Sequence, residues 1–208
     1  MWPQDRSPWS TPRWGCTSDR GRAPEVGARP ERSRWSILAV CTANVCRSPL
    51  MELLLKERLD PSTFEVASAG VMGWRDAPVD SMVRLELARL EIDGSDFRSQ
   101  PLEVRHVRGA DLVLTATKEH RSAVLELDPG ALRKTFTLLE FAALVEGHEA
   151  THLPELVADA ARRRSTGPAR ADVPDPFRRS PAVHRGTADL IDEATASIAR
   201  TLSLLQPA

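Results

Sequence analysis

With 208 residues and a formal net charge of −1, the chain is large enough for one domain with a substantial core, and it lacks the basic excess of most nucleic-acid-binding proteins. No apolar run approaches the roughly 20 residues of a membrane span, and the N-terminus lacks the apolar stretch of a signal peptide. Three cysteines, an odd number, do not suggest a disulfide scaffold, so we expect a cytoplasmic protein. From the charge and the lack of an apolar run, we expect it to bind neither nucleic acid nor membrane.

Residues 1–34 differ in composition from the rest of the chain. They are rich in Pro, Arg, Ser and Gly, and Trp2, Trp9 and Trp14 stand isolated in polar surroundings. Because such a segment has too little apolar surface to form a core, we predict a disordered N-terminal extension here. The folded domain is then predicted to occupy residues 35–208.

Strand and helix patterns alternate along this domain. Predicted strands cover residues 36–40, 64–70, 111–116 and 136–139. Predicted helices cover residues 49–59, 79–92, 118–127, a short stretch after the fourth strand, 153–164 and 187–205. The alternation favours a doubly wound α/β fold, with a central four-stranded parallel sheet and helices on both faces. Ligands of such folds bind beyond the carboxyl ends of the strands, where Cys41 follows the first strand.

The segment CTANVCRS, residues 41–48, joins that strand to the next predicted helix. Ser48 is a good N-cap, and Pro49 suits a first helical turn. The intervening loop would therefore wrap around the positive end of a helix with its N–H groups turned inward, as in an anion-binding nest. The pattern predicts a phosphate-binding loop of the Cys-x5-Arg type.

Several side chains of this loop suit chemistry on a bound phosphate. Arg47 offers a planar fork of donors, and the positive field favours the thiolate form of Cys41 for in-line attack on phosphorus. We expect Asn44 to lock the loop from behind or to adopt a left-handed backbone conformation. We expect the Ser48 hydroxyl to donate to the thiolate.

Other interpretations of the cysteines fit less well. A zinc site needs further ligands and a thioredoxin-like pair needs Cys-x-x-Cys, whereas Cys41 and Cys46 are five residues apart; we therefore predict no metal and no cofactor. Cys16 also begins a Cys-x5-Arg match, but no strand precedes it and no helix follows it, so we interpret it as chance. The alternative without a catalytic role is that Cys41 is a buried structural cysteine at a strand end.

Hydrolysis also needs a group that protonates the leaving oxygen and later deprotonates water. The segment DVPDPF, residues 172–177, offers Asp175 between Pro174 and Pro176, which keep the backbone extended. Asp172 is a competitor that lacks the flanking prolines. From spacing alone, an acidic turn residue is the favoured interpretation of Asp175.

The segment VCTANVCRSPLME and the distant DPF together resemble the low-molecular-weight protein tyrosine phosphatases. Further similar segments are SAG (68–70) with Trp74 and Pro78, EIDGSDFRSQPL (91–102) and DLVLTATKEHR (111–121). The resemblance runs from about residue 36 to residue 205. It implies a cytosolic, metal-free enzyme that hydrolyses phosphotyrosine through a phosphocysteine intermediate. A phosphorylated protein would be its substrate, and a cognate tyrosine kinase system is a further expected partner.

The resemblance also implies roles for individual residues. Cys41 would be the nucleophile, Arg47 the phosphate clamp, and Asp175 the acid and then the base. The implied substrate-binding residues are Thr42, Ala43, Asn44, Val45, Cys46, Ser48, Trp74 and Phe177. Cys46 is further implied to form a reversible disulfide with Cys41 under oxidation.

The chain departs from the family pattern at several positions. Ala43 replaces a glycine, Phe177 replaces a tyrosine, and Ala116–Thr117 replaces a Met-Asp pair, so that one supporting carboxylate is missing. The segment 147–171 is longer than usual, and its predicted helix is either a contact surface or a solvated spacer.

Three other functions stay open on this fold. Phosphoarginine phosphatases resemble the family but tend to carry threonine where Val45 stands. Arsenate reductases need the same anion-binding loop but depend on thiols for electron transfer. A non-catalytic phosphate-binding module would lose the acid, and the complete set of Cys41, Arg47 and Asp175 argues against it.

Overall fold

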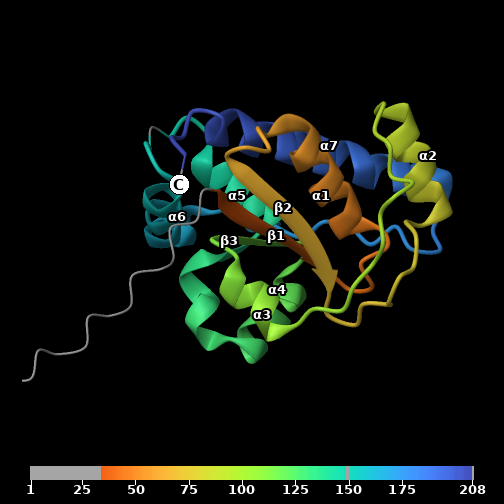
Figure 1. The fold of residues 1–208 in the computed structure, drawn as a ribbon, viewed down its shortest axis with the longest axis horizontal. Coiled ribbons are helices and arrows are strands. Elements are labelled where there is room, and N and C mark those ends of the chain that lie inside the picture. Colours follow the sequence, from red (N-terminus) through yellow and green to blue (C-terminus); the bar gives the residue numbers. More distant parts are fainter. Residues whose placement is uncertain (1–33, 149, 208) are drawn as a thin grey trace, which may run out of the picture. The chain divides into compact units, whose positions relative to one another are not determined.

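The computed structural model describes residues 34–148 and 150–207. The predicted disordered extension lies outside the described residues apart from Arg34, as does the chance match at Cys16. Four strands form one parallel sheet in the order β2–β1–β3–β4 (Figure 1). Their bounds are Trp35–Cys41 for β1, Phe64–Gly70 for β2, Leu112–Thr115 for β3 and Thr135–Thr137 for β4.

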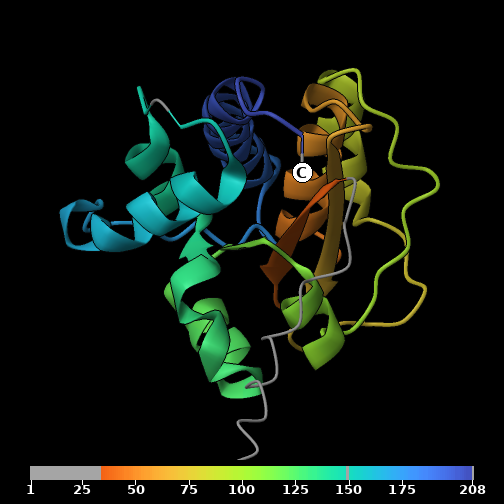
Figure 2. The ribbon, with the colours of Figure 1, turned by 60° about the vertical axis from the view of Figure 1, so that its left-hand side comes forward.

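Helices cover both faces of this sheet, as predicted (Figure 2). The helices are α1 (Arg47–Arg58), α2 (Ser81–Arg89), α3 (Val104–Gly109), α4 (Lys118–Leu127), α5 (Leu138–Val145), α6 (Leu153–Arg162) and α7 (Pro181–Leu202). Two 3-10 turns lie at Pro129–Lys134 and Arg164–Thr166. Within the described ranges, no helix is both long enough and apolar enough to cross a membrane.

The alternation of side chains along β1 builds two separate cores. Ile37 and Ala39 belong to the larger buried cluster, to which α1, α5 and α7 contribute. Leu38 and Val40 point to the opposite face and join the smaller cluster with residues of α3 and α4. Because both faces of β1 are buried, its sequence is continuously apolar, which is typical of a central parallel strand.

The sheet order also explains where the site lies. The chain passes from β1 outward to β2 and then returns across β1 to β3, so the connections leave β1 and β3 in opposite directions. Ligands of open α/β sheets bind at such a switch point, beyond the carboxyl ends of the strands. The segment that follows Cys41 occupies this position.

Several boundaries differ from the predictions. The helix α1 begins at Arg47, and its N-cap is Cys46 without a side-chain bond, so the prediction of Ser48 as the N-cap is wrong. The fourth strand ends at Thr137, because the Thr137 hydroxyl accepts from Glu140 N and starts α5 there. The helix α7 begins six residues earlier than predicted, at Pro181, since proline is favourable in a first helical turn. The short helix α3 was not predicted.

Candidate active site

The loop between β1 and α1 is held from outside by the segment that follows β2. The carbonyl oxygens of Cys41 and Thr42 each accept a backbone hydrogen bond of 2.9 Å from this segment, at Val71 N and Met72 N. A Cβ atom at Gly70 would lie 2.6 Å from the Thr42 oxygen, so only glycine permits this close approach. With these carbonyls turned outward, the loop's amide groups are left for its inner side.

Asn44 holds the loop from behind and also takes a left-handed backbone conformation, so both expectations for this residue are confirmed. Its φ is 58° and its side chain is fully buried. The amide nitrogen donates to Ser48 Oγ at 2.9 Å and to Ser68 Oγ at 2.7 Å, while the amide oxygen accepts from Gln100 N at 2.9 Å. The side chain thus ties the loop to α1, to β2 and to the link before α3.

The buried Cys41 thiol lies at the base of this loop, with its Sγ atom 3.0 Å from Ser48 Oγ. Because the Asn44 amide donates to the same Ser48 oxygen, the Ser48 hydroxyl hydrogen is free to point at Sγ. Such a donor stabilises a sulfur anion more than a neutral thiol. Ser48 therefore contributes to the site as a hydrogen-bond donor, and its place in the second position of α1 suits this purpose.

Arg47 is buried beneath the loop, and only part of its guanidinium has protein partners. Its Nη1 donates to Val173 O at 3.3 Å, and its Nη2 donates to Thr42 Oγ1 at 3.2 Å. The same Nη2 lies 3.2 Å from Asp175 Oδ2. The Nε atom is buried without any partner in the described part of the chain, which is costly for a donor unless a ligand accepts from it. An oxyanion held in the loop would satisfy this donor.

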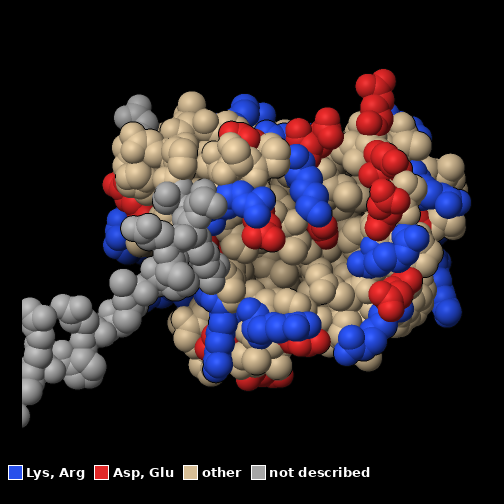
Figure 3. Space-filling view, in the orientation of Figure 1, with Lys and Arg blue, Asp and Glu red and all other residues tan. Residues whose placement is uncertain are grey.

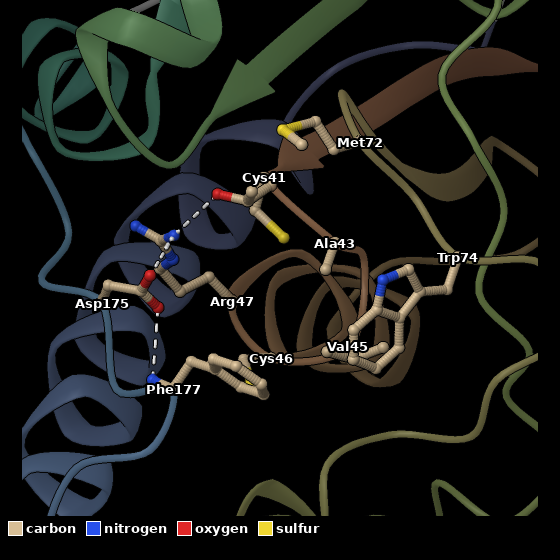
Figure 4. A pocket seen from close by; sticks show the side chains of 10 residues that line it. Cys41, Ala43, Val45, Cys46, Arg47, Met72, Trp74, Asp175 and Phe177 are labelled. Carbon is tan, nitrogen blue, oxygen red and sulfur yellow. Dashed lines mark hydrogen bonds and ion pairs between the residues drawn. The ribbon is translucent and has the colours of Figure 1, made fainter.

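Asp175 lies beside the Arg47 guanidinium, on the side of the cavity opposite Trp74 (Figure 4). Its carboxylate is 54% exposed, and its Oδ1 accepts from Phe177 N at 3.3 Å. The preceding segment is fixed to the end of β3, because Val173 N donates to Ala116 O at 2.8 Å. Asp172 points elsewhere and accepts from Lys118 N at 2.8 Å, so the structure separates the two acids that the sequence left in competition.

A cavity of about 220 Å³ opens above these groups. The side chains that line it are Cys41, Thr42, Ala43, Val45, Cys46, Arg47, Met72, Trp74, Asp175 and Phe177. Trp74 and Phe177 meet edge to face, with their ring centroids 6.3 Å apart. Asn44 and Ser48 do not line the cavity, because both side chains are fully buried behind the loop. That their backbone N–H groups bind substrate stays a prediction.

Met72 and His120 are two functional candidates that sequence reasoning missed. Met72 lines the cavity because a turn after β2 brings it beside the loop, and no periodic pattern signals such a turn. His120 lies in the first turn of α4 and connects to the loop through Thr42, with Nε2 2.9 Å from Thr42 Oγ1. The histidine in the segment KEHR was the available signal, but spacing alone assigned it no partner.

The two ring nitrogens of His120 have different hydrogen-bonding roles. Burial, followed by the nearby Arg47, lowers the pKa of His120 to about 4, so the imidazole is neutral near pH 7. The Thr117 hydroxyl donates to Glu119 and lowers the pKa of that carboxyl, so Thr117 Oγ1 accepts from His120 Nδ1 at 3.0 Å. Nε2 is then the acceptor for the Thr42 hydroxyl, whose oxygen in turn receives Arg47 Nη2.

Cys46, the second cysteine of the loop, differs from Cys41 in its surroundings. The pKa of the Cys46 thiol is raised far above its ordinary value, mainly by burial and next by the nearby Asp80. Cys46 is therefore a neutral thiol at physiological pH. Both cysteines are free, and the disulfide between them stays a prediction. Elsewhere within residues 34–148 and 150–207, no three His, Cys, Asp or Glu side chains gather as a metal site requires.

The sequence is similar to that of several known proteins. The sequence model described as low molecular weight phosphotyrosine protein phosphatase matches residues 36–158. A protein-arginine-phosphatase of Geobacillus stearothermophilus is 35% identical over 113 residues, which are 54% of this chain and 75% of the relative. The low molecular weight protein-tyrosine-phosphatase Etp of Escherichia coli is 29% identical over 168 residues, or 81% of this chain and 95% of the relative.

Solved structures show the same fold. The YwlE arginine phosphatase from Geobacillus stearothermophilus superposes with a TM-score of 0.64 at 30% identity, covering 81% of this chain and 92% of that one. Vibrio vulnificus Wzb in complex with benzylphosphonate superposes with a TM-score of 0.63 at 28% identity, covering 80% of this chain and 97% of that one.

Proposed function

Because the chain belongs to the low molecular weight phosphotyrosine protein phosphatase family, we propose that it removes phosphate from phosphotyrosine in proteins through a phosphocysteine intermediate. One observation carries the proposal. A thiol, a guanidinium with an unpaired Nε and a carboxylate converge on one cavity, contributed by Cys41, Arg47 and Asp175. A nucleophile, an anion clamp and a proton donor are the groups that this hydrolysis needs.

In the first step, the Cys41 thiolate attacks phosphorus in line with the leaving tyrosyl oxygen. The S–P bond forms while the P–O bond to tyrosine breaks, and Asp175 gives its proton to the departing oxygen. Arg47 and the inward amides stabilise the charge on the three remaining oxygens. The incoming phosphate replaces Asp175 as the partner of Arg47, which leaves the carboxyl group beside the leaving oxygen.

In the second step, Asp175 acts as a base. Its carboxylate takes a proton from a water molecule, whose oxygen attacks phosphorus as the S–P bond breaks. The electron pair returns to Cys41, and the Ser48 hydroxyl at 3.0 Å stabilises the regenerated thiolate. The exposed position of Asp175 suits this role, because the attacking water enters from solvent.

The cavity walls support an aryl phosphate as substrate. Beside Cys41, Thr42, Cys46, Arg47 and Asp175, the lining consists of apolar or aromatic side chains: Ala43, Val45, Met72, Trp74 and Phe177. Trp74 and Phe177 form an edge-to-face corner at the rim, which suits contact with a flat ring. We include in the proposal a cytoplasmic location and a tyrosine kinase system that supplies the phosphorylated protein.

Phosphoarginine hydrolysis is the second candidate, and the comparisons favour considering it. A relative at 35% identity and a structural neighbour at 30% identity are both named arginine phosphatases. Val45 is the position at issue, since its side chain lines the cavity floor where those enzymes are expected to carry threonine. An apolar side chain there offers no hydrogen bond to a guanidinium group.

Parallel assays would decide between these functions. Phosphotyrosine peptides, phosphoarginine peptides and arsenate would be offered to the full chain, each with and without a thiol reductant and a chelator. We expect turnover of phosphotyrosine peptides that chelators leave unchanged. The Cys41→Ser variant should lose turnover and still bind phosphate. Full activity of that variant would contradict the nucleophile, and turnover confined to phosphoarginine or to arsenate would contradict the substrate.

A further inference from the structure

Arginines follow both aromatic residues at the cavity rim. Trp74 is followed by Arg75, and Phe177 is followed by Arg178 and Arg179. All three arginines are exposed. The Arg178 guanidinium carbon lies over the Phe177 ring, 5.2 Å from its centroid, while the ring itself lines the cavity. This stacking holds one cation at the cavity mouth.

The backbone conformation at this rim is unusual. Arg178 has a φ of 58°, which L-residues other than Asn and Asp seldom adopt, and Asp76, one residue after Arg75, has a φ of 56°. The turn at Arg178 is closed by a 2.9 Å hydrogen bond from Arg179 N to Pro176 O. Asp adopts this conformation readily, so the strained residue at the rim is Arg178, and its turn fixes where Arg178 and Arg179 leave the backbone.

The rim arginines lack carboxylate partners within the described residues, as do Arg133 and Arg200 elsewhere on the surface, so what sets them apart is their position beside the cavity. On the face shown in Figure 3, basic side chains are interspersed with acidic ones. In the described part of the chain, none of Arg75, Arg178 and Arg179 lies within ion-pairing distance of a carboxylate. The acids nearest in sequence to Arg178 are engaged elsewhere, Asp175 with Arg47 and Asp172 with Lys118 N.

We propose that Arg75, Arg178 and Arg179 bind acidic side chains that flank the phosphorylated residue, so that the preferred substrates are phosphotyrosine segments rich in Asp and Glu. The proposal rests on the proposed function and names its substrate class. A peptide whose phosphotyrosine ring enters the cavity beside Trp74 and Phe177 brings its neighbouring residues near the arginines that follow these two aromatic residues. The cations there attract carboxylates and repel Lys and Arg.

Three phosphotyrosine peptides of equal length, with acidic, neutral or basic flanks, would test this preference. We expect kcat/KM of the full chain to be roughly ten-fold higher for the acidic than for the neutral peptide at low salt, since each exposed ion pair contributes modestly. The basic peptide is expected to be the poorest. At an ionic strength of about 1 M the preference should shrink, because the Debye length falls to about 3 Å.

Charge reversal at the rim supplies the decisive variant. In the triple variant Arg75→Glu, Arg178→Glu and Arg179→Glu, the order of the acidic and basic peptides should invert. The matched control reverses three exposed arginines at the opposite end of the sheet: Arg108→Glu, Arg133→Glu and Arg200→Glu. The control should keep the parent's acidic-to-neutral ratio, because it changes net charge equally but lies away from the cavity.

The outcomes separate the two proposals. Equal kcat/KM for acidic and neutral peptides in an active parent, or an unchanged ratio in the rim variant, would overturn the rim proposal alone. Absence of turnover for every phosphotyrosine peptide would overturn the proposed substrate. Phosphoarginine peptides with the same acidic, neutral and basic flanks would then test the rim proposal. Faster turnover of the acidic peptide would support the proposal, and equal turnover of the three peptides, or none, would refute it.

Discussion

The two loops that form the site are held in opposite ways. The phosphate-binding loop, residues 41–48, lies at the end of β1, and its residues Asn44 and Ser48 are fully buried. The Asn44 side chain hydrogen-bonds to α1, to β2 and to the link before α3. The acid loop, residues 172–179, is anchored to β3 and to Arg47 mainly through Val173, and it leaves the Asp175 carboxylate half exposed.

This difference follows from what each loop has to do. An anion-binding loop stabilises charge only if its donors are already aligned, and buried hydrogen bonds hold them so. The acid must meet both a leaving group and a water molecule, so it needs access to solvent. Prolines on either side of Asp175 limit its backbone freedom where few hydrogen bonds do. Perturbing the first loop should therefore affect both folding and turnover, and perturbing the second should affect turnover alone.

The largest effect is expected from Asp175→Asn. Turnover of a phosphotyrosine peptide should fall by roughly two to four orders of magnitude, because the amide can neither donate the proton nor accept it from water. The free energy of unfolding should change by less than about 1 kcal/mol, since the Asp175 side chain is half exposed and an asparagine oxygen can still accept from the buried Arg47. Steady-state assays and urea unfolding would measure the two quantities.

Asp172→Asn is the control for this variant. Its carboxylate accepts from Lys118 N at the start of α4 and does not line the cavity, so turnover should stay close to that of the parent. A greater loss of turnover in Asp172→Asn than in Asp175→Asn would contradict the assignment of Asp175 as the acid.

The next effect is expected from Arg47→Lys. A lysine keeps the charge but loses the planar fork and the buried Nε donor, so kcat/KM should fall roughly 10²–10³-fold and inhibition by vanadate should weaken. Arg58→Lys, at the other end of α1, removes contacts to Asp192 and Thr195 and should cost stability without altering vanadate binding. Equal vanadate affinity in Arg47→Lys and the parent would contradict the clamp.

Asn44→Ala tests the buried side of the comparison. It removes three hydrogen bonds and leaves a side chain at a φ of 58°, so we expect a loss of about 2–4 kcal/mol in the free energy of unfolding. Asn44→Gly loses the same bonds but accepts this backbone conformation and should be about 1 kcal/mol more stable than the alanine variant. Urea unfolding of the alanine variant at the parent's midpoint would refute the anchoring role of Asn44.

The smallest effect concerns pH. Burial and Arg47 lower the pKa of His120 from 6.5 to about 4, against the opposing influence of Glu119, Asp175 and Asp172. The unfolded chain therefore binds more protons than the folded chain between these values, and the free energy of unfolding should fall as pH drops from about 6.5 to about 4. The full shift in pKa corresponds to at most about 3.4 kcal/mol.

His120→Gln sharpens this measurement, because glutamine can bond to Thr42 but does not titrate. Unfolding curves of both proteins between pH 4 and pH 7 would give the contribution of His120 as the difference in slope. Parallel pH dependences in the two proteins would show that His120 is not the group concerned.

Short-range information accounts for the part of this protein that was predicted correctly. Apolar runs bounded by helical patterns were enough for the four-stranded parallel sheet, since burial on both faces of β1 requires a continuous apolar sequence. The order strand, loop, helix placed Cys41 and Arg47 around one helix N-terminus, because residues six apart across such a turn must lie close together.

The tertiary structure alone shows how distant residues reach the site. The flanking prolines and the DPF segment already favoured Asp175 over Asp172, but only the anchoring of Val173 to the end of β3 shows how one carboxylate faces Arg47 and the other α4. His120 and Met72 reach the loop through packing of α4 and of the turn after β2. Such contacts join segments from separate parts of the chain, and no local periodicity or spacing records how those segments meet in three dimensions.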